Sequence, residues 1–358
     1  MRVVVDGYVY GKRSSEGIAR YWTETLKATL QLNLPVRFDV VVPPDARRPE
    51  GVPCRTHGRL SACWAAFRAD VFHSTYYTRW PRMKCPSVAT AYDFVDANFP
   101  EFKPNGPGFV DRQLDVLRRA SAVIAISKST RDLAVQTAGI DPGRVFVAYP
   151  GVTPAFAGPL PEAEEIRRYR QERTGGAPYL LHVGKRRTYK NFLTILRAFG
   201  RAAQQTDRHL LVLGGPAAMT PEETEALAAG RLVERVHFIP QADDAELRLA
   251  YAGAVALVNA SRMEGFGIPV IEALACGTGL ILSDIPVYRE IADPMAVFVP
   301  STDVAAWAGA LAAPVPVRSR WREDVLRRFQ WRDAARVHAQ AYAFACSQPP
   351  PHVYGKAG

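Results

Sequence analysis

The second half of the chain contains the segment Glu264-Gly265-Phe266-Gly267-Ile268-Pro269-Val270-Ile271-Glu272. The apolar run 254–259 that precedes it has the length of a buried strand. Pro269 suits the first turn of a helix, because its missing N–H would be unpaired there, and Gly277 suits the position just past the helix end. We therefore expect a loop that carries Glu264, followed by a helix that carries Glu272 in its first turn.

The chemistry of this segment suits a ligand with both hydroxyls and phosphates. Each carboxylate can accept hydrogen bonds from a pair of sugar hydroxyls. Gly265 and Gly267 let backbone amides approach a diphosphate at the helix N-terminus, and Phe266 and Ile268 belong to the same predicted donor site. For either glutamate alone, a plainer interpretation stays open: Glu272 complements the helix dipole, or Glu264 is a solvated loop charge.

The segment resembles the glutamate–seven residues–glutamate signature of retaining glycosyltransferases of family 4 (glycosyl transferases group 1), which have the GT-B fold. The likeness continues through residues 273–278 to Ser283 and Asp284. In that family the first glutamate contacts the donor sugar and the second holds the ribose of the nucleotide. The resemblance implies these roles for Glu264 and Glu272.

Length and composition indicate a globular chain of two domains. The chain has 358 residues, of which 48% are hydrophobic and 22% charged. It has no run of about 18 apolar residues, so we expect no transmembrane helix. The N-terminus becomes acidic too soon for a signal peptide, and five cysteines without a Cys-x-x-Cys pair favour a reducing compartment without a zinc site. These features favour a cytoplasmic protein.

The net charge of +10 is uneven, because residues 1–150 hold 21 Lys and Arg against 14 Asp and Glu, a surplus of +7. A basic half suits a phosphorylated substrate or an anionic membrane surface, or it only keeps the surface hydrated. Nucleic acid is not expected, since no recognisable binding motif accompanies the charge. The cations that cluster in one stretch are Arg47, Arg48, Arg55, Arg59, Arg68, Arg79, Arg82 and Lys84.

Strands and helices alternate in both halves, which predicts two mainly parallel sheets of the α/β class. The predicted strands are 2–6, 38–42, 70–73, 87–91, 122–126, 144–148, 179–183, 210–213, 236–239, 254–259 and 297–299. The resemblance implies two Rossmann-like domains that face each other across a crevice. Residues 1–155 would bind the acceptor, with the terminal helix 332–347 packed back on them, and residues 175–330 would bind the nucleotide sugar.

In the first half, candidate site residues follow the predicted strands, where ligands of parallel sheets bind. Gly17 lies in a stretch that resembles the family's Gly-Ile-Gly-Arg-Tyr segment and could put amides against phosphate. Tyr92 and Asp93 resemble its His-Asp-Leu segment, with tyrosine in place of the histidine that usually lies beside the donor sugar. Either Asp93 takes that contact or Tyr92 donates a hydrogen bond. His73 is a further candidate, although a lone histidine at a strand end is more often structural.

The second half has four cations directly after the predicted strand 179–183: Lys185, Arg186, Arg187 and Lys190. Fixed cations there would stabilise the charge that develops on a leaving nucleoside diphosphate, unless the loop is only a solvated basic turn. Lys190 matches the family pattern. Lys185 replaces its arginine, which keeps the charge without the bidentate fork, and Arg186 substitutes if the loop turns. Gln241 follows strand 236–239, where family members usually meet the nucleobase.

The resemblance implies a retaining hexosyltransferase that moves a sugar from a nucleoside-diphosphate sugar to a glycan or lipid-linked acceptor, as in bacterial surface polysaccharide assembly. The chain has no Asp-x-Asp, so we expect metal-independent transfer and no cofactor. A lipid-linked acceptor would place the protein peripherally on the inner membrane face. Two alternatives stay open: a phosphorylase or epimerase on the same fold, and a catalytically silent binding subunit, which Tyr92 and Lys185 favour.

Overall fold

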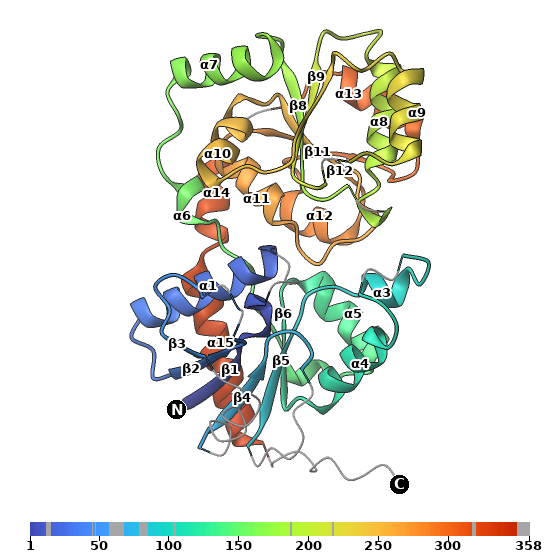
Figure 1. Cartoon of the computed structure of the whole chain (residues 1–358). Helices are drawn as coiled ribbons and strands as arrows, with labels where there is room; N and C mark the ends of the chain where they lie inside the picture. The colour runs from blue at the N-terminus through green and yellow to red at the C-terminus, as the bar shows by residue number, and fades with distance from the viewer. Residues whose placement is uncertain are drawn as a thin grey trace. The chain divides into compact units, whose positions relative to one another are not determined.

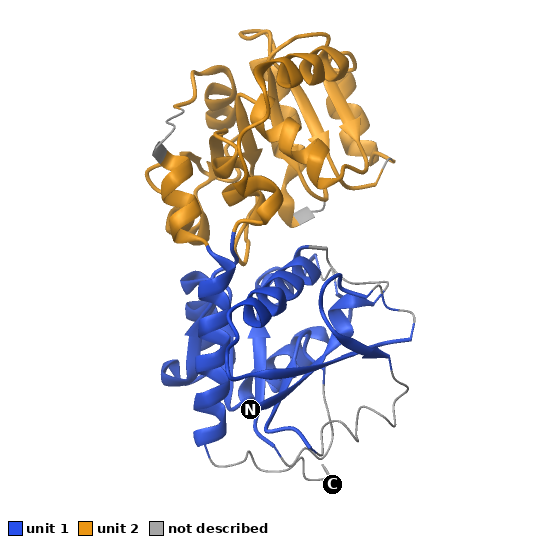
Figure 2. Cartoon of the chain, turned by 90° about the vertical axis from the view of Figure 1, so that its left-hand side faces the viewer, with its two compact units in different colours: residues 1–151, 330–358 blue, residues 152–329 orange. Residues whose placement is uncertain are grey.

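The computed structural model describes residues 1–11, 16–44, 46, 48–56, 68–78, 85–102, 105–186, 188–216, 218–316 and 320–348. The chain forms two compact units, one of residues 1–151 and 330–358 and the other of residues 152–329 (Figure 2). Each unit has its own parallel sheet. Residues 156–174, which the sequence left between the two predicted domains, belong to the second unit.

The first unit contains a seven-stranded sheet in the order β3-β2-β1-β4-β5-β6-β7, and its described pairs are all parallel. Its strands are β1 (Arg2–Asp6), β2 (Arg37–Val42), β3 (Cys54–Thr56), β4 (Val71–Ser74), β5 (Ser87–Ala91), β6 (Ala122–Ala125) and β7 (Val145–Val147). Its helices are η1 (Gly7–Tyr10), α1 (Glu16–Gln31), α3 (Val95–Asn98), α4 (Phe109–Arg119), α5 (Lys128–Ala138), η2 (Pro142–Arg144) and α15 (Trp331–Ser347). Figure 1 shows α1 and α15 on one side of this sheet and α4 and α5 on the other.

Helix α15 completes the first unit although it follows the whole second unit in the sequence. Buried residues recur along it at spacings of three and four, as in an amphipathic helix: Trp331, Ala334, Ala335, His338, Ala341, Tyr342 and Ala345. A Cβ on Gly151 would lie 2.4 Å from the backbone nitrogen of Trp331, so the start of α15 packs against bare backbone. The predicted packing of the terminal helix on the N-terminal half is therefore confirmed.

A buried cluster of neutral polar and aromatic side chains joins α15 to the sheet. The His73 ring nitrogens lie 2.8 Å from the Tyr342 hydroxyl and 2.9 Å from the Thr90 hydroxyl. The His338 ring stacks 5.8 Å from the His73 ring and lies 3.4 Å from the Tyr21 hydroxyl. Both histidines are buried, so His73 has the structural role and does not face a ligand.

The second unit contains a six-stranded parallel sheet in the order β10-β9-β8-β11-β12-β13. Its strands are β8 (Tyr179–Val183), β9 (His209–Leu213), β10 (Val236–Ile239), β11 (Ala256–Asn259), β12 (Gly279–Ser283) and β13 (Val297–Val299). Its helices are α6 (Pro154–Ala157), α7 (Ala163–Thr174), η3 (Thr188–Lys190), α8 (Phe192–Ala202), α9 (Pro221–Ala229), α10 (Asp244–Gly253), α11 (Ile268–Ala275), α12 (Pro286–Ala292), α13 (Val304–Ala312) and α14 (Arg320–Arg328). Helices α8 and α13 pack their apolar faces on the central strands.

Two strands and one cap differ from the sequence expectations. The prediction did not include β3, which has only three residues, or β12, which follows α11 after a short turn. The cap of α5 is Ser127, whose side chain accepts a hydrogen bond from the Thr130 amide, and the expectation of Ser129 was wrong. The helix begins at Lys128, so Ser129 already lies in its first turn.

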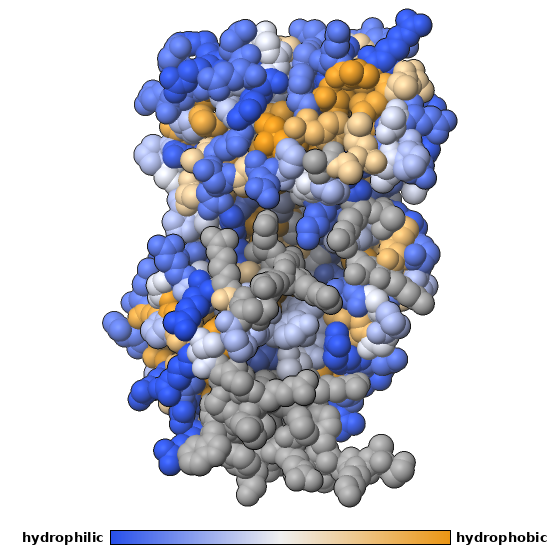
Figure 3. All heavy atoms as spheres, viewed as in Figure 1, coloured by the Kyte–Doolittle hydropathy of each residue, from blue (hydrophilic) through white to orange (hydrophobic). Residues whose placement is uncertain are grey.

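On the face in Figure 3, hydrophilic side chains cover most of the described surface and apolar ones form local groups. None of the helices within the described ranges is both long and apolar enough to cross a membrane.

The buried histidines predict a loss of stability in acid. Burial lowers the pKa of His338 to about 4, and burial and the neighbouring His338 lower that of His73. The unfolded chain binds protons to these rings below pH 6.5, whereas the folded chain keeps them neutral, so stability falls as the pH drops from about 6.5 to about 4. For His338 the loss at pH 5 is about 2 kcal/mol. Calorimetry of His338→Gln should show a flatter dependence of melting temperature on pH; an unchanged slope would contradict this.

Candidate functional site

The loop between β11 and α11 has the predicted local structure. Pro269 lies in the first turn of α11, and Gly277 follows the helix end with a φ of +76°. Gly267, the N-cap, has a φ of +108°. A Cβ there would also lie only 2.8 Å from Tyr288 Cε1, so both the backbone conformation and the neighbouring ring require glycine.

Glu264 forms an ion pair with Lys190 at the carboxyl end of the sheet. The Lys190 Nζ lies 2.6 Å from Glu264 Oε1, and the two side chains are 23% and 11% exposed. Ser261 Oγ lies 2.6 Å from the same Oε1 atom. Asn259 Oδ1 in turn accepts a hydrogen bond from the Ser261 amide at 3.0 Å. Glu264 is therefore held by neighbours and is not a solvated loop charge.

Glu272 lies deeper in the second unit than the sequence suggested. Helix α11 begins at Ile268, so Glu272 is its fifth residue and the expectation of a place in the first turn was wrong. The side chain is buried, and its Oε2 accepts a hydrogen bond from the Tyr251 hydroxyl at 3.1 Å. Burial, with the Glu272 charge as the next cause, raises the pKa of the Cys276 thiol to about 12. A carboxylate in this position does not serve to cap the helix dipole.

The lysines of the basic loop after β8 differ in solvent exposure and in their contacts. Lys185 is exposed, whereas Lys190 pairs with Glu264. Asn191 ties the loop to the segments that follow β11 and β13, because its Nδ2 donates to Ala260 O at 3.1 Å and to Ser301 O at 2.6 Å. Arg187 lies outside the described residues. The loop is therefore anchored at its C-terminal end, beside Lys190.

Arg186 does not extend from this loop as the prediction required. Its side chain is 3% exposed and its Nε lies 3.1 Å from Glu223 Oε1, whose side chain is 5% exposed. It also donates to Ala218 O at 2.9 Å and lies 4.8 Å from the centre of the Phe238 ring. Removing one member of a buried pair leaves an uncompensated charge and costs about 3–5 kcal/mol. We therefore assign Arg186 to the frame of the second unit and withdraw its predicted contact with the donor.

The remaining predicted donor residues of the second unit differ in exposure. Gln241 is exposed after β10, and Ile268 is half-buried at the start of α11. Gly265 is buried, and Phe266 is 3% exposed with its ring 5.5 Å from that of Phe329. The Phe266 side chain thus packs into the interior of the second unit beneath the loop. Gln241, after β10, and Ile268, at the start of α11, remain at least partly accessible to solvent.

Of the predicted residues of the first unit, Tyr92 and Gly17 are placed differently from the expectation. The Tyr92 hydroxyl is buried, accepts a hydrogen bond from Trp22 Nε1 at 2.6 Å and donates to Thr75 O at 2.6 Å. It therefore cannot offer its proton to a ligand in this arrangement. Asp93 is half-buried, and its Oδ1 accepts from the Val95 amide at 3.1 Å. Gly17 is exposed within the first turn of α1 and not ahead of it.

Sequence reasoning missed Ser261, Asn259 and Tyr251. Asn259 and Ser261 are polar residues at the end of a buried strand, and that signal could have identified them. Tyr251 lies on α10, and no local pattern points from it to Glu272. No group of three or more metal-binding side chains occurs among the residues whose structure is described.

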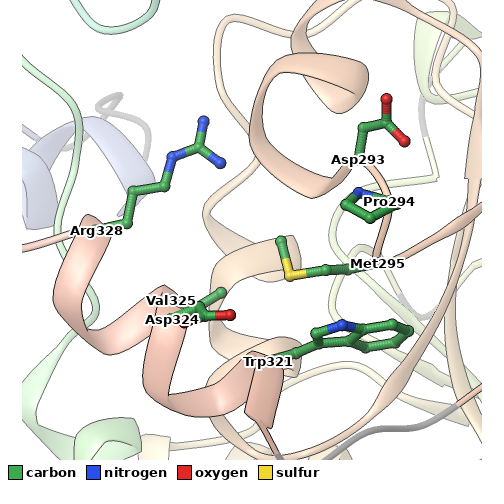
Figure 4. A pocket seen from close by; sticks show the side chains of 7 residues that line it. All are labelled: Asp293, Pro294, Met295, Trp321, Asp324, Val325 and Arg328. Carbon is green, nitrogen blue, oxygen red and sulfur yellow. The ribbon is translucent and has the colours of Figure 1, made fainter.

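A separate pocket of about 320 Å³ lies in the second unit between α14 and the residues after α12. Figure 4 shows Trp321 and Met295 together at its base, with Asp293 and Arg328 on opposite sides. Arg328 is already engaged, because its guanidinium donates to Glu290 O and Ile291 O. None of the predicted site residues lines this pocket, whose lining residues are Asp293, Pro294, Met295, Trp321, Asp324, Val325 and Arg328.

Comparison with known families matches both halves of the chain. Residues 164–314 match the family described as glycosyl transferases group 1, and residues 17–156 match glycosyltransferase family 4. The D-inositol 3-phosphate glycosyltransferase of Xylanimonas cellulosilytica is 30% identical over 309 residues, which cover 78% of this chain and 73% of that protein. The O-antigen chain mannosyltransferase RfbU of Salmonella typhimurium is 27% identical over 195 residues, which cover 54% of this chain and only 51% of RfbU.

Solved structures of low sequence identity share the fold. Anabaena Alr3699/HepE, in complex with UDP and glucose, superposes with a TM-score of 0.76 at 15% identity, covering 96% of this chain and 99% of that one. The lipopolysaccharide outer core galactosyltransferase WaaB superposes with a TM-score of 0.65 at 12% identity, covering 95% and 99%. With two units of parallel sheet and helices, and with both halves matched, the chain belongs to the family 4 (group 1) glycosyltransferases of the GT-B fold.

Proposed function

We propose that this glycosyltransferase moves a sugar from a nucleoside-diphosphate sugar to a glycan or lipid-linked acceptor, with retention of configuration and without a metal ion. The observation that carries the proposal is the Lys190–Glu264 pair at the carboxyl end of the second unit's sheet, next to the helix that holds Glu272. The names of relatives that build O-antigen chains support a role in surface polysaccharide assembly. The solved complex of Alr3699/HepE with UDP-glucose supports a nucleotide sugar as donor.

In the proposed mechanism, donor binding separates the ion pair. The Lys190 ammonium turns to the diphosphate, and the Glu264 carboxylate accepts hydrogen bonds from hydroxyls of the donor sugar. As the bond to the anomeric carbon breaks, negative charge grows on the diphosphate, and a fixed cation stabilises it more in the transition state than in the ground state. Lys185, exposed on the same loop, supplies a second positive charge.

The acceptor's proton passes to the leaving phosphate oxygen on the same face of the sugar, so no side chain acts as the nucleophile. Glu272 holds the ribose hydroxyls, and Asp93 is the remaining candidate of the first unit for a contact with the sugar. The lysines take the electrostatic role that a divalent metal has in other transferases. A catalytically silent binding subunit would bind the nucleotide without turning over its sugar, and a phosphorylase would form a sugar 1-phosphate from free glycan.

Glu272→Gln should weaken nucleotide binding without unfolding the protein. The glutamine amide keeps a carbonyl oxygen that can accept from the Tyr251 hydroxyl, but it lacks the negative charge that strengthens hydrogen bonds from ribose hydroxyls. Loss of such a charged hydrogen bond should raise the Kd for the nucleotide about ten- to hundredfold. Titration calorimetry with UDP and GDP measures the change, with Glu225→Ala as the control because Glu225 is an exposed glutamate of the same unit. An unaltered Kd for both nucleotides would remove the ribose role.

Lys190→Ala should lower kcat by about a hundredfold while changing nucleotide affinity much less, because its main contact forms as the leaving group gains charge. Radiolabelled sugar transfer and donor hydrolysis from UDP-, GDP- and dTDP-sugars measure kcat. Equal losses in kcat and affinity would make Lys190 a ground-state anchor.

In the same assay EDTA should leave the unmodified enzyme active. Loss of activity with EDTA, restored by Mg²⁺ or Mn²⁺, would contradict the metal-free mechanism.

We further propose that the basic first unit holds the enzyme at an anionic cytoplasmic membrane surface, where lipid-linked acceptors lie. Of the eight clustered cations, Arg48, Arg55 and Arg68 are described and exposed, and the other five lie outside the described residues. Arg55 is 74% exposed and lies 3.7 Å from Asp39, so its head group stays near water.

Sedimentation with phosphatidylglycerol vesicles tests this placement. Each cation near the surface contributes about 1 kcal/mol, so binding should rise with the anionic lipid fraction and fall with salt. Replacing Arg48, Arg55 and Arg68 together by glutamate should abolish binding to the vesicles. If the unmodified protein stays in the supernatant at low salt, the basic cluster is not a membrane site. The acceptor would then be a water-soluble glycan.

A further inference from the structure

Tyr288 lies under the loop that carries Glu264. It belongs to α12 and is fully buried, and its Cε1 lies 2.8 Å from the point where a Cβ of Gly267 would stand. The ring therefore supports the backbone of the loop at the N-cap of α11. Sequence analysis did not identify Tyr288.

The Tyr288 hydroxyl is buried and makes no hydrogen bond of ordinary geometry to any described residue. It nevertheless lies close enough to Ser261 and Glu264 for both side chains to act on its pKa as hydrogen-bond partners. Burial is the main cause that raises the pKa of Tyr288, and the negative charge of Glu264 raises it further. Buried polar groups almost always have well-formed hydrogen bonds, so a tyrosine hydroxyl that has none beside a carboxylate requires an explanation.

The charge balance at Glu264 supplies that explanation. In the structure both Lys190 Nζ and Ser261 Oγ lie 2.6 Å from Glu264 Oε1. If Lys190 turns to the diphosphate, Glu264 loses its cation while its side chain is only 11% exposed. The sugar hydroxyls supply part of the hydrogen bonding, and a carboxylate that water barely reaches needs a further donor from the protein in place of the lost cation. The neighbouring hydroxyl without a well-formed hydrogen bond is that of Tyr288.

We propose that Tyr288 is a positioning residue whose hydroxyl donates a hydrogen bond to Glu264 when Lys190 leaves it. This inference rests on the proposed function for its role in catalysis. The exchange of donors keeps the carboxylate aimed at the sugar while the ammonium contacts the diphosphate. The Tyr288 ring and the Tyr288 hydroxyl thus have separate roles, and Tyr288→Phe removes only the second.

A double-mutant cycle tests the exchange without a substrate. In the unmodified background Tyr288→Phe removes a buried hydroxyl that has no well-formed hydrogen bond, so the melting temperature of the full chain should rise by about 2–4 °C. In a Lys190→Met background the hydroxyl should already pair with Glu264, so the same change should lower the melting temperature. Differential scanning calorimetry measures both shifts. Shifts of the same sign and size in both backgrounds would overturn the proposal.

Tyr179→Phe is the matched control. Tyr179 is also fully buried in the second unit, but its hydroxyl donates to Ala250 O at 2.8 Å. Its loss should lower the melting temperature equally in both backgrounds and leave kcat unchanged.

Kinetics give the second readout, with UDP-glucose and GDP-mannose as the probes for donor hydrolysis. Tyr288→Phe should lower kcat about ten- to hundredfold, with KM for the donor nearly constant, because the hydrogen bond forms only once Lys190 has moved. An unchanged kcat in an active enzyme would overturn the catalytic role of Tyr288 alone. An unmodified enzyme that neither hydrolyses nor transfers either sugar would instead count against the proposed function. The calorimetric cycle would still test whether Tyr288 replaces Lys190 as the hydrogen-bond donor to Glu264.

Discussion

The ion pair between Lys190 and Glu264 depends on loops from several strands meeting at one edge of a parallel sheet. Hydrogen bonds to the backbone fix these loops relative to one another. Asn191 binds the carbonyls that follow β11 and β13, and Ser283 Oγ, at the end of β12, donates to Ser261 O. The two charges therefore stand on a rigid frame, and each is tolerated with little water because the other lies beside it.

The buried cluster around α15 and the buried charges of the second unit are stabilised in different ways. The cluster in the first unit is neutral: His73, His338 and Tyr92 pair with hydroxyls, rings and carbonyls, and burial keeps the histidines uncharged. The second unit buries charges in the Arg186–Glu223 pair and at Glu272, and the first unit also has buried carboxylates, as at Asp39. A neutral network rigidifies a scaffold, and the Arg186–Glu223 pair likewise belongs to the frame, whereas the Lys190–Glu264 pair suits a place where a ligand brings its own charge.

The sequence predicts those features that depend on neighbouring residues. The loop and helix of the Glu264–Glu272 segment follow from Pro269, Gly267 and Gly277, whose backbone preferences act locally. Features that depend on distant partners could not be predicted. Arg186 is buried because Glu223 reaches it from α9, and Tyr92 turns inward because Trp22 and Thr75 supply its partners from other elements. The buried carboxylate of Glu272 likewise requires Tyr251 from α10.

The position of α15 in the sequence has a consequence for the order in which the protein is completed on the ribosome. Residues 152–329 of the second unit are contiguous, so its core can close as soon as they have emerged. The first unit begins earlier but lacks Trp331, His338 and Tyr342 until translation has passed the whole second unit. During that interval the face of its sheet that α15 will cover stays exposed. The half that is synthesised first is therefore the half that is finished last.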